Sequence, residues 1–453
     1  MKNFKQFFTS LFILALALSI NSDVYSQWTL AGLVTNAGTS PSISVVDQNI
    51  VWVAGGPTGT PVVSRSTNAG ANWTNVPTSQ LPLEVYCVWG IDANTCYVGN
   101  GGAAGGAGGN AQYYKTTDAG VTWTVVGSTG GSAGFFNGVV FSKTMPSFGV
   151  AQSDPPTGAG QSYYLGITTD GGLTWTPTTA TGFAGTASAQ NSIVVIDNMF
   201  YGFGSNTTPP AFIYTSNGGT SWQKSNTGAP GNFTSGVAFS DDKMHGLVSS
   251  STSLPTIART TNGGVSFTNV TGVAGLTGYS TIKWIEGTNT VYTSSAIGAS
   301  GVVQKSTNGG LNWTVMSTSS LTGITHMEFR RVGNTVYGFA VTANGAVLKL
   351  VETITGVNNI SSSVPDGYSL DQNFPNPFNP STSINFSIPV TGKVNLTVYN
   401  SLGKEVATLV NENLAAGSYS SEFTAASDLT SGIYFYTITS GNFSDTKKLM
   451  LVK

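Results

Sequence analysis

Short runs of alternating apolar and polar residues, each ending at a turn, fill most of the chain. The stretch from Ile43 to Val76 shows the unit: ISVVD, a turn, IVWVAGG, a loop, VVSRS, a second turn and a closing WTNV. Successive side chains of a strand point to opposite faces, so such runs predict four short strands that pair as one antiparallel sheet. The unit has no helical periodicity.

One phrase follows the third predicted strand of each unit. It reads STNAGANWT from Ser66 and STNGGLNWT from Ser306, and six versions have their third residue at positions 68, 118, 170, 217, 262 and 308. Spacings of 45 to 52 residues are typical of the blades of a β-propeller. The Asp or Asn can accept hydrogen bonds from its own turn, and the Gly can adopt a left-handed conformation. We expect the Trp or Phe ring that follows to be buried between blades.

A seventh blade is predicted from both ends of the repeated region. Residues 324–350 align with the first three strands of the sixth unit, but no Trp strand follows them. The missing strand is predicted in QWTLAGL from Gln27, because this segment reads like the strand after a repeated phrase. Closure by an N-terminal strand leaves no open sheet edge. We therefore predict an all-β fold with a seven-bladed β-propeller over residues 27–351.

The repeated phrase, S/T-x-D/N-x-G-x-x-W, resembles the Asp-box, or bacterial neuraminidase repeat. In that family the boxes lie on blade edges away from the substrate. They occur in sialidases, xyloglucan-cleaving glycosidases, sortilin-type receptors and photosystem assembly factors, so the resemblance implies a fold and not an activity. The structural box residues that it implies are Asn68, Asp118, Asp170, Asn217, Asn262 and Asn308, with the rings of Trp73, Trp123, Trp175, Trp222, Phe267 and Trp313.

The last part of the chain has a different pattern. A linker at residues 352–367 precedes strand-like stretches over residues 368–453, which predict a small β-sandwich. The tail contains FPNPFNPST from Phe374, LTSGIYFYTI from Leu429 and a terminal KKLMLVK. It resembles the C-terminal sorting domain of the type IX (Por) secretion system of Bacteroidetes and related bacteria. The resemblance implies a partner, the outer-membrane translocon that reads this tail.

The N-terminus predicts a secretory signal peptide over residues 1–26. Two lysines precede an apolar run from Phe7 to Ile20, and the polar segment after it suits cleavage before Gln27. The run is too short for a membrane span, so we expect no transmembrane segment in the mature chain. With the tail, this signal predicts passage through the periplasm to the medium or to the outer-membrane surface.

Composition excludes several partners and sites. Charged residues are 8% of the chain, against about 25% in a typical soluble domain, and the net charge is -2 without a basic cluster. Nucleic acid and anionic membranes are therefore not expected partners. The chain has two Cys and two His, so we expect no metal and no cofactor. Cys87, Cys96, His245 and His326 are expected to be packing residues, with the cysteines as buried free thiols.

The long insertions fall on one side of the predicted ring, between second and third strands, at residues 99–110, 151–162, 204–211 and 249–256. Variable loops above a rigid scaffold are where binding usually resides. The candidates for stacking on sugars or anchoring a protein are Tyr113, Tyr114, Phe135, Phe136, Tyr163 and Tyr164. The Gly-rich insertion at 99–110 lacks the helix and Lys of a phosphate site, so we expect a flexible loop.

A glycosidase would need two carboxylates about 5 to 10 Å apart, and resemblance to sialidases would imply an arginine triad. Two of the propeller's four arginines hold a repeat position occupied elsewhere by Lys, and Arg330 and Arg331 are neighbours on one strand. The catalytic candidates that remain are Glu84, Asp154 and Glu328, which we expect to be solvated acids rather than a catalytic pair.

We therefore predict a secreted or cell-surface binding protein for a glycan or a protein, exported by the type IX system. The alternatives are a sialidase-like or xyloglucanase-like hydrolase and a scaffold that resembles the photosystem assembly factors.

Overall fold

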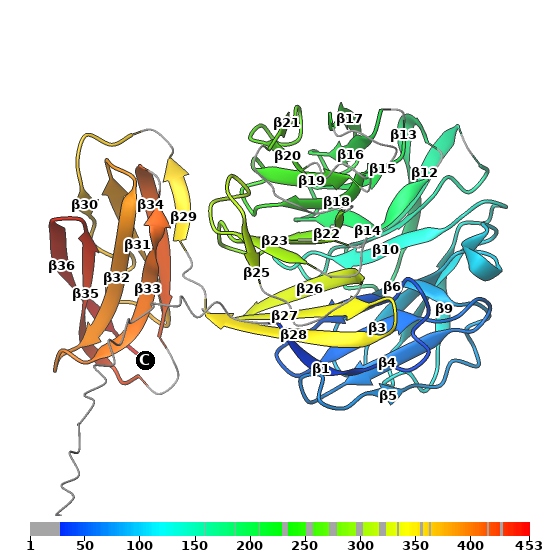
Figure 1. Ribbon diagram of the computed structural model, residues 1–453, viewed down its shortest axis with the longest axis horizontal. Helices are drawn as coiled ribbons and strands as arrows, with labels where there is room; N and C mark the ends of the chain where they lie inside the picture. The colour runs from blue at the N-terminus through cyan, green and yellow to red at the C-terminus, as the bar shows by residue number, and fades with distance from the viewer. Residues whose placement is uncertain are drawn as a thin grey trace, which may run out of the picture.

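The structure, a computed structural model, describes residues 28–158, 160–185, 187–207, 209–228, 234–250, 257–270, 279–295, 302–316, 323–332, 335–353, 357–361, 364–414, 416–425 and 429–453. The predicted signal peptide lies outside these residues. The described residues form nine four-stranded sheets, of which seven form a ring and two form a C-terminal sandwich (Figure 1). Within the described part of the chain, no helix is long and apolar enough to cross a membrane.

Blades 1 to 6 each consist of four consecutive strands. In chain order they are β2–β5 (Ser42–Val45, Val51–Gly55, Val62–Ser66, Thr74–Asn75), β6–β9 (Val85–Gly90, Cys96–Asn100, Gln112–Thr116, Thr124–Ser128), β10–β13 (Phe136–Phe141, Gly149–Ser153, Gln161–Thr168, Thr176–Gly185), β14–β17 (Ser188–Val195, Tyr201–Ser205, Ala211–Thr215, Gln223–Asn226), β18–β21 (Thr234–Phe239, Gly246–Ser250, Ile257–Thr260, Thr268–Asn269) and β22–β25 (Tyr279–Trp284, Val291–Ser295, Val303–Ser306, Thr314–Met316).

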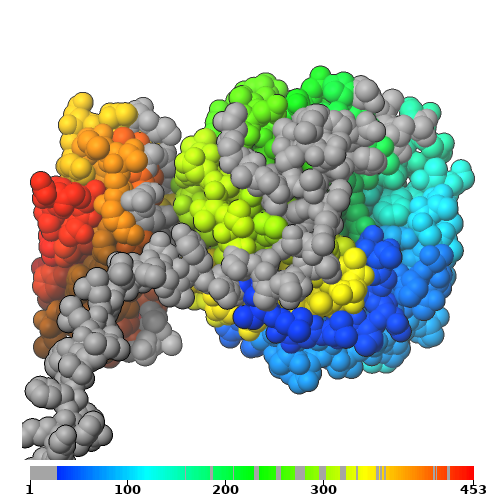
Figure 2. All heavy atoms as spheres, viewed as in Figure 1, coloured from blue at the N-terminus to red at the C-terminus, as the bar shows by residue number. Residues whose placement is uncertain are grey.

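Blade 7 joins the two ends of the ring. Its strands are β26 (Ile324–Val332), β27 (Thr335–Thr342) and β28 (Ala346–Thr353), and β1 (Thr29–Leu33) pairs with β28 as the fourth. Trp28, which is 1% exposed, packs edge-on against Phe329 with ring centroids 5.9 Å apart. Figure 2 shows the blue N-terminal residues packed beside the yellow residues of this blade. The predicted seven blades and their closure by the N-terminal strand are confirmed.

The apolar cores lie between neighbouring blades. One cluster joins Trp52 and Val63 of blade 1 to Val85 and Val98 of blade 2, and similar clusters follow around the ring. Burial decreases from the axis outward: every residue of β18 is buried, whereas both residues of β21 in the same blade are exposed. A single blade cannot bury its own faces, so each needs its neighbours.

The two cysteines lie in two neighbouring cores, Cys87 in the core shared with blade 3 and Cys96 in the core shared with blade 1. Cys87 is on β6 and Cys96 is on β7, and both are buried and free, which confirms the expectation for the two thiols. Burial raises the pKa of Cys87 to about 12, so the sulfur stays a protonated apolar group.

Each repeated phrase forms the turn between the third and fourth strands and has the same hydrogen bonds in all six copies. The first hydroxyl accepts from the N–H of the fifth residue at 2.8 to 3.0 Å. The Asp or Asn Oδ1 accepts from the N–H of the seventh residue at 2.9 to 3.0 Å. The fourth residue donates its N–H to the turn between first and second strands, as from Gly309 to the Asn289 carbonyl at 2.8 Å.

These bonds place the turns between first and second strands and those between third and fourth strands on one side of the ring, which we call the turn face. The loops between second and third strands and the connections between blades lie on the other side, the loop face. The predicted grouping of the turns follows from the alternating strand directions.

The rings of the repeated phrases differ from the expectation of full burial. Trp123 is buried, but five rings are only partly buried: Trp73, Trp175, Trp222, Phe267 and Trp313. The Trp175 ring packs on Tyr97 and Tyr113 of the preceding blade, with centroids 5.8 and 5.2 Å away. Because these rings start the outermost strand of each blade, part of each ring stays at the surface.

The C-terminal sandwich has two sheets. One is ordered β29 (Val357–Ser361), β34 (Gly417–Thr424), β31 (Ser381–Ile388), β30 (Ser369–Leu370), and the other β33 (Glu405–Leu414), β32 (Gly392–Asn400), β35 (Gly432–Ser440), β36 (Phe443–Leu451). The Pro-rich segment runs along β36, where the Phe378 N–H donates to the Met450 carbonyl at 2.9 Å and the Val452 N–H donates to the Phe378 carbonyl at 3.0 Å. This segment covers part of an edge that would otherwise be open to pairing.

Candidate functional site

Glu84, immediately before β6, is 2% exposed, so the expectation of a solvated loop acid is wrong for this residue. Its carboxylate accepts hydrogen bonds from the Gly59 N–H at 2.6 Å, from the Tyr86 hydroxyl at 2.9 Å and from the Gly105 N–H. Burial acts to raise the pKa of Glu84, but these donors hold it below its usual value. The acid ties a loop of blade 1 to the Gly-rich loop of blade 2.

Asp154 follows β11 and is partly buried, which also differs from the expected solvated acid. Its Oδ1 accepts from the Asn137 side-chain amide at 2.7 Å and from the Ser188 N–H at 2.7 Å. Burial raises the pKa of Asp154 to about 6, although both hydrogen bonds oppose that rise. The residue joins the loop-face ends of blades 3 and 4.

Glu328 is 4% exposed on the innermost strand of blade 7, so it is not solvated either. Its two oxygens lie 2.9 Å from Lys143 Nζ and 2.8 Å from Lys283 Nζ. Burial acts to raise the pKa of Glu328, and the two ammonium groups hold it well below its usual range. Among the described residues, the three candidate acids share no hydrogen-bond or ion-pair partner, and Glu84 and Glu328 line different cavities, so the structure does not assemble them into one site.

The candidate aromatic residues are mostly interior. Five are buried: Tyr113, Tyr114, Phe136, Tyr163 and Tyr164. The third strand of a blade packs against both neighbouring blades, so two consecutive aromatic residues on it are both buried, one on each side. Tyr113, for example, packs against Phe136 of the next blade, with ring centroids 4.9 Å apart. This burial contradicts a role as exposed platforms. Phe135 is partly buried, and its ring lies 4.6 Å from the ring of Tyr86.

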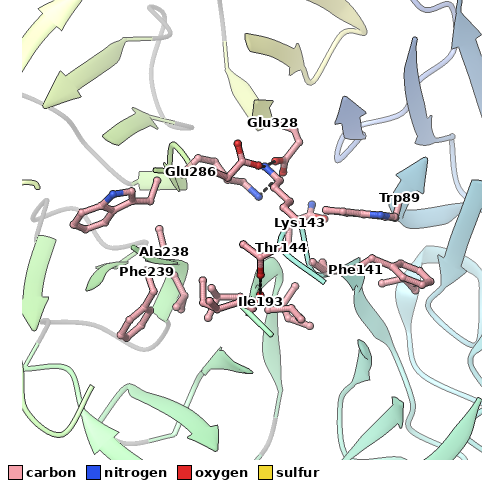
Figure 3. Close-up of a pocket in the computed structure, with 18 of the residues that line it drawn as sticks. Trp89, Phe141, Lys143, Thr144, Ile193, Ala238, Phe239, Glu286 and Glu328 are labelled. Atoms are coloured by element: carbon pink, nitrogen blue, oxygen red, sulfur yellow. Dashed lines mark hydrogen bonds and ion pairs between the residues drawn. The ribbon is translucent and has the colours of Figure 1, made fainter. Parts of the chain in front are cut away.

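A cluster of charged residues at the centre of the ring was not predicted. Lys143, in the turn between β10 and β11 of blade 3, pairs with Glu286 of blade 6 at 3.2 Å and with Glu328 of blade 7. Blade 3 does not adjoin blades 6 and 7, so this side chain crosses the central channel (Figure 3). Arg330 lies 3.8 Å from Glu286, and the Arg331 guanidinium donates to the Glu286 carbonyl at 2.9 Å.

A sequence signal for this cluster exists. The chain of 453 residues has only 18 Lys and Arg and 20 Asp and Glu. Because charged residues are so rare, several of them on or beside the innermost strands can be recognised in the sequence as an unusual group. Buried charges are tolerated when they are paired, which is the arrangement found here.

The other end of the channel is crossed by residues of β14. The pairing of β14 with β15 shifts between Ser188 and Ile193, and the extra residues reach blades 1 and 2. Gln190 donates to the Ser40 carbonyl at 3.0 Å and to the Tyr86 carbonyl, and Asn191 Oδ1 accepts from the Ser42 hydroxyl at 3.1 Å.

A cavity of about 100 Å³ lies in the channel, with Val139, Ile193 and Val237 in its wall. Figure 3 shows Ile193, Ala238, Phe239, Phe141 and Trp89 around the Lys143 cluster. His326 also lines the cavity, where its Nδ1 accepts from the Ile43 N–H at 3.1 Å, and burial lowers its pKa to about 3. Crossed at both ends, the channel offers little room for a macromolecular ligand.

A groove of about 550 Å³ lies on the loop face between blades 1 and 2. Its lining combines glycines, hydroxyl groups, one acid and one aromatic ring: Gly38, Thr39, Ser40, Gly55, Gly56, Pro57, Thr58, Glu84, Val85, Tyr86 and Gly105. Of the residues described there, none is Lys or Arg. The groove is several times larger than the channel cavity and has the size of an ordinary ligand site.

Residues 372–453 match a protein family described as "Secretion system C-terminal sorting domain". No curated protein matches the chain. The C-terminal sandwich is therefore the sorting domain of a type IX secretion system, and such a tail directs export to the cell surface or the medium.

Three solved structures are similar to the chain. YCF48 bound to D1 peptide is 15% identical with a TM-score of 0.53, over 72% of this chain and 98% of that one. An ancestral GH74 enzyme is 13% identical with a TM-score of 0.50, over 94% of this chain and 64% of that one. The WD40 propeller domain of Doa1 is 10% identical with a TM-score of 0.50, over 72% of this chain and 98% of that one. At these identities the likeness shows the propeller fold alone.

Proposed function

We propose that this protein is a secreted or surface-displayed binding protein whose loop face recognises an extracellular glycan or protein. The sorting domain supports the export step, with the type IX translocon as the partner that reads the tail. The loop face supports the binding step, because it carries a groove of about 550 Å³ above a rigid ring.

The observation that carries binding over hydrolysis is the state of the carboxylates. A glycosidase needs one carboxyl group to donate a proton and a second to act as nucleophile or base. Glu84 is held ionised by hydrogen bonds from Gly59, Tyr86 and Gly105. Glu328 is held ionised by ion pairs with two ammonium groups. Asp154, with a pKa of about 6, is the candidate best suited to act as a general acid. Its Oδ1, however, already accepts hydrogen bonds from Asn137 and Ser188.

The hydrolase alternative is motivated by the likeness to a GH74 enzyme, and the scaffold alternative by the likeness to YCF48 bound to a peptide. Neither likeness carries more than the fold. The scaffold proposal and the binding proposal agree that the propeller holds a partner; they differ in whether that partner lies outside the cell, which the sorting tail favours.

The test is a screen of the purified full chain against sialosides and β-glucans, in which both binding and turnover are measured. We expect saturable binding without product. Glu84→Gln and Asp154→Asn serve as matched controls, because each removes one ionisable carboxyl group and keeps the side-chain size. Turnover by the parent that disappears in either variant would replace binding with hydrolysis.

A further inference from the structure

The groove between blades 1 and 2 contains an aromatic ring that is fixed before any ligand arrives. The Tyr86 hydroxyl donates a hydrogen bond to Glu84 at 2.9 Å. The Tyr86 ring packs against the Phe135 ring, with centroids 4.6 Å apart. Burial and the neighbouring Glu84 raise the pKa of Tyr86, so the hydroxyl remains a donor. A ring held in this way loses little conformational freedom when a ligand stacks on it.

The Gly-rich loop contributes to this arrangement, although it was expected to be a flexible insertion. A Cβ atom at Gly106 would lie 2.7 Å from the Phe135 ring and 3.0 Å from the Tyr86 hydroxyl. At Gly101 a Cβ atom would lie 2.9 Å from the same Phe135 ring. Glycine at these positions therefore lets the loop lie directly on the two rings, and the Gly105 N–H reaches Glu84.

The polar groups around Tyr86 suit a ligand rich in hydroxyl groups. Thr39, Ser40 and Thr58 line the groove and are exposed. Each hydroxyl can donate and accept one or more hydrogen bonds, as sugar hydroxyls do. Among the described lining residues the one formal charge is that of Glu84, and its oxygens already accept three hydrogen bonds.

We propose that this groove binds uncharged sugar units of a glycan, with Tyr86 as the stacking platform and Thr39, Ser40 and Thr58 as hydrogen-bonding partners. The proposal rests on the proposed binding function and names its ligand class and its site. An acidic sugar is disfavoured because the lining offers it no cation and presents a carboxylate nearby.

The experiment measures binding of the full chain to neutral oligosaccharides, such as β-glucan and mannan fragments, and to sialylated ones, by calorimetry. We expect the neutral ligands to bind at least about tenfold more tightly. Tyr86→Ala should weaken that binding about tenfold or more, whereas Tyr86→Phe should change it less than about threefold, because the ring remains.

A second pair of variants does not depend on Tyr86, whose removal could disturb the loops. Thr58→Arg places a bulky side chain in the groove from an exposed position and should abolish binding of neutral sugars. Thr60→Arg makes the same change at an exposed position of the same loop that does not line the groove, and should leave binding intact. The unfolding temperature of each variant checks the fold.

The outcomes separate this inference from the proposed function. Glycan binding that survives both Tyr86→Ala and Thr58→Arg overturns the groove assignment and leaves the binding function standing. Binding of sialylated glycans alone, or of a protein ligand alone, overturns the neutral-sugar class in the same way. Failure to bind any glycan or protein would overturn both.

Discussion

At the scale of single residues, Glu84, Asp154 and Glu328 show that identical chemical groups take different roles according to the donors around them. Two backbone N–H groups and a hydroxyl hold Glu84, two amide donors hold Asp154, and two ammonium groups hold Glu328. All of these donors except Tyr86 come from loops or blades distant in the sequence. The three acids could therefore be identified from the sequence but their surroundings could not, and the expectation that their side chains are solvated is wrong.

Asp154 provides a pH prediction. Its pKa rises from 3.8 to about 6 on folding, so the folded state binds the proton more tightly than the unfolded chain. The resulting stabilisation is complete below the unfolded pKa and is lost as the pH rises through about 6. In Asp154→Asn the uncharged amide resembles the protonated carboxyl group, and its oxygen can still accept the hydrogen bonds from Asn137 and Ser188. We expect it to raise the free energy of unfolding on the order of 1 kcal/mol at neutral pH and to change little near pH 4.

Denaturant unfolding of parent and variant across this pH range measures the difference. A stability difference that stays the same at both ends of the range would contradict the raised pKa of Asp154.

The repeated turns provide a prediction with an internal control. Asn217 Oδ1 accepts from the Thr215 hydroxyl and the Ser221 N–H, both at 2.9 Å. Asp118 makes the equivalent bonds in its own turn. We expect Asn217→Ala to lower the free energy of unfolding by about 1 kcal/mol, because two donors lose their acceptor, and Asn217→Asp to have little effect. Equal losses in the two variants, measured by thermal unfolding, would show that the shared Oδ1 contacts do not stabilise the turn.

At the scale of elements, the strands were predictable because their alternation, their turns and the 45-to-52-residue repeat agree with one another. The N-terminal strand was predictable because blade 7 lacked a fourth strand and QWTLAGL supplied one. The shift in β14 that carries Gln190 and Asn191 across the channel was not predictable. A bulge of this kind depends on partners in blades 1 and 2, which sequence-local patterns do not identify.

Weakening the closure of the ring by β1 should measurably destabilise the protein. Trp28 is buried against Phe329, so Trp28→Ala leaves a cavity beside β28 and loosens the pairing of the strand that follows. We expect a loss of about 3 to 5 kcal/mol in the free energy of unfolding. Leu33→Ala, at an exposed position of the same strand, is the control and should cost little. Similar losses in both variants would contradict the role of Trp28 in closing the ring.

At the scale of the whole molecule, the chain combines a seven-bladed propeller with a type IX sorting domain. The sequence was sufficient for both parts, because blades repeat and the tail carries recognisable motifs. The site was less predictable. Five of six candidate aromatics are interior, whereas the platform proposed here, Tyr86, was not among the candidates. The exposure of a ring on a propeller depends on which neighbouring loops cover it, and the sequence does not show that the Gly-rich loop packs against Tyr86 and Phe135.

The most direct test of this account is the location of the propeller with and without its tail. The full-length protein and a variant lacking residues 368–453 are expressed in a bacterium with a type IX secretion system, and periplasm, outer surface and medium are assayed for the propeller. We expect the full-length protein on the surface or in the medium, and the truncated protein, still folded and able to bind its ligand, in the periplasm. Equal appearance of both proteins outside the cell would contradict the account.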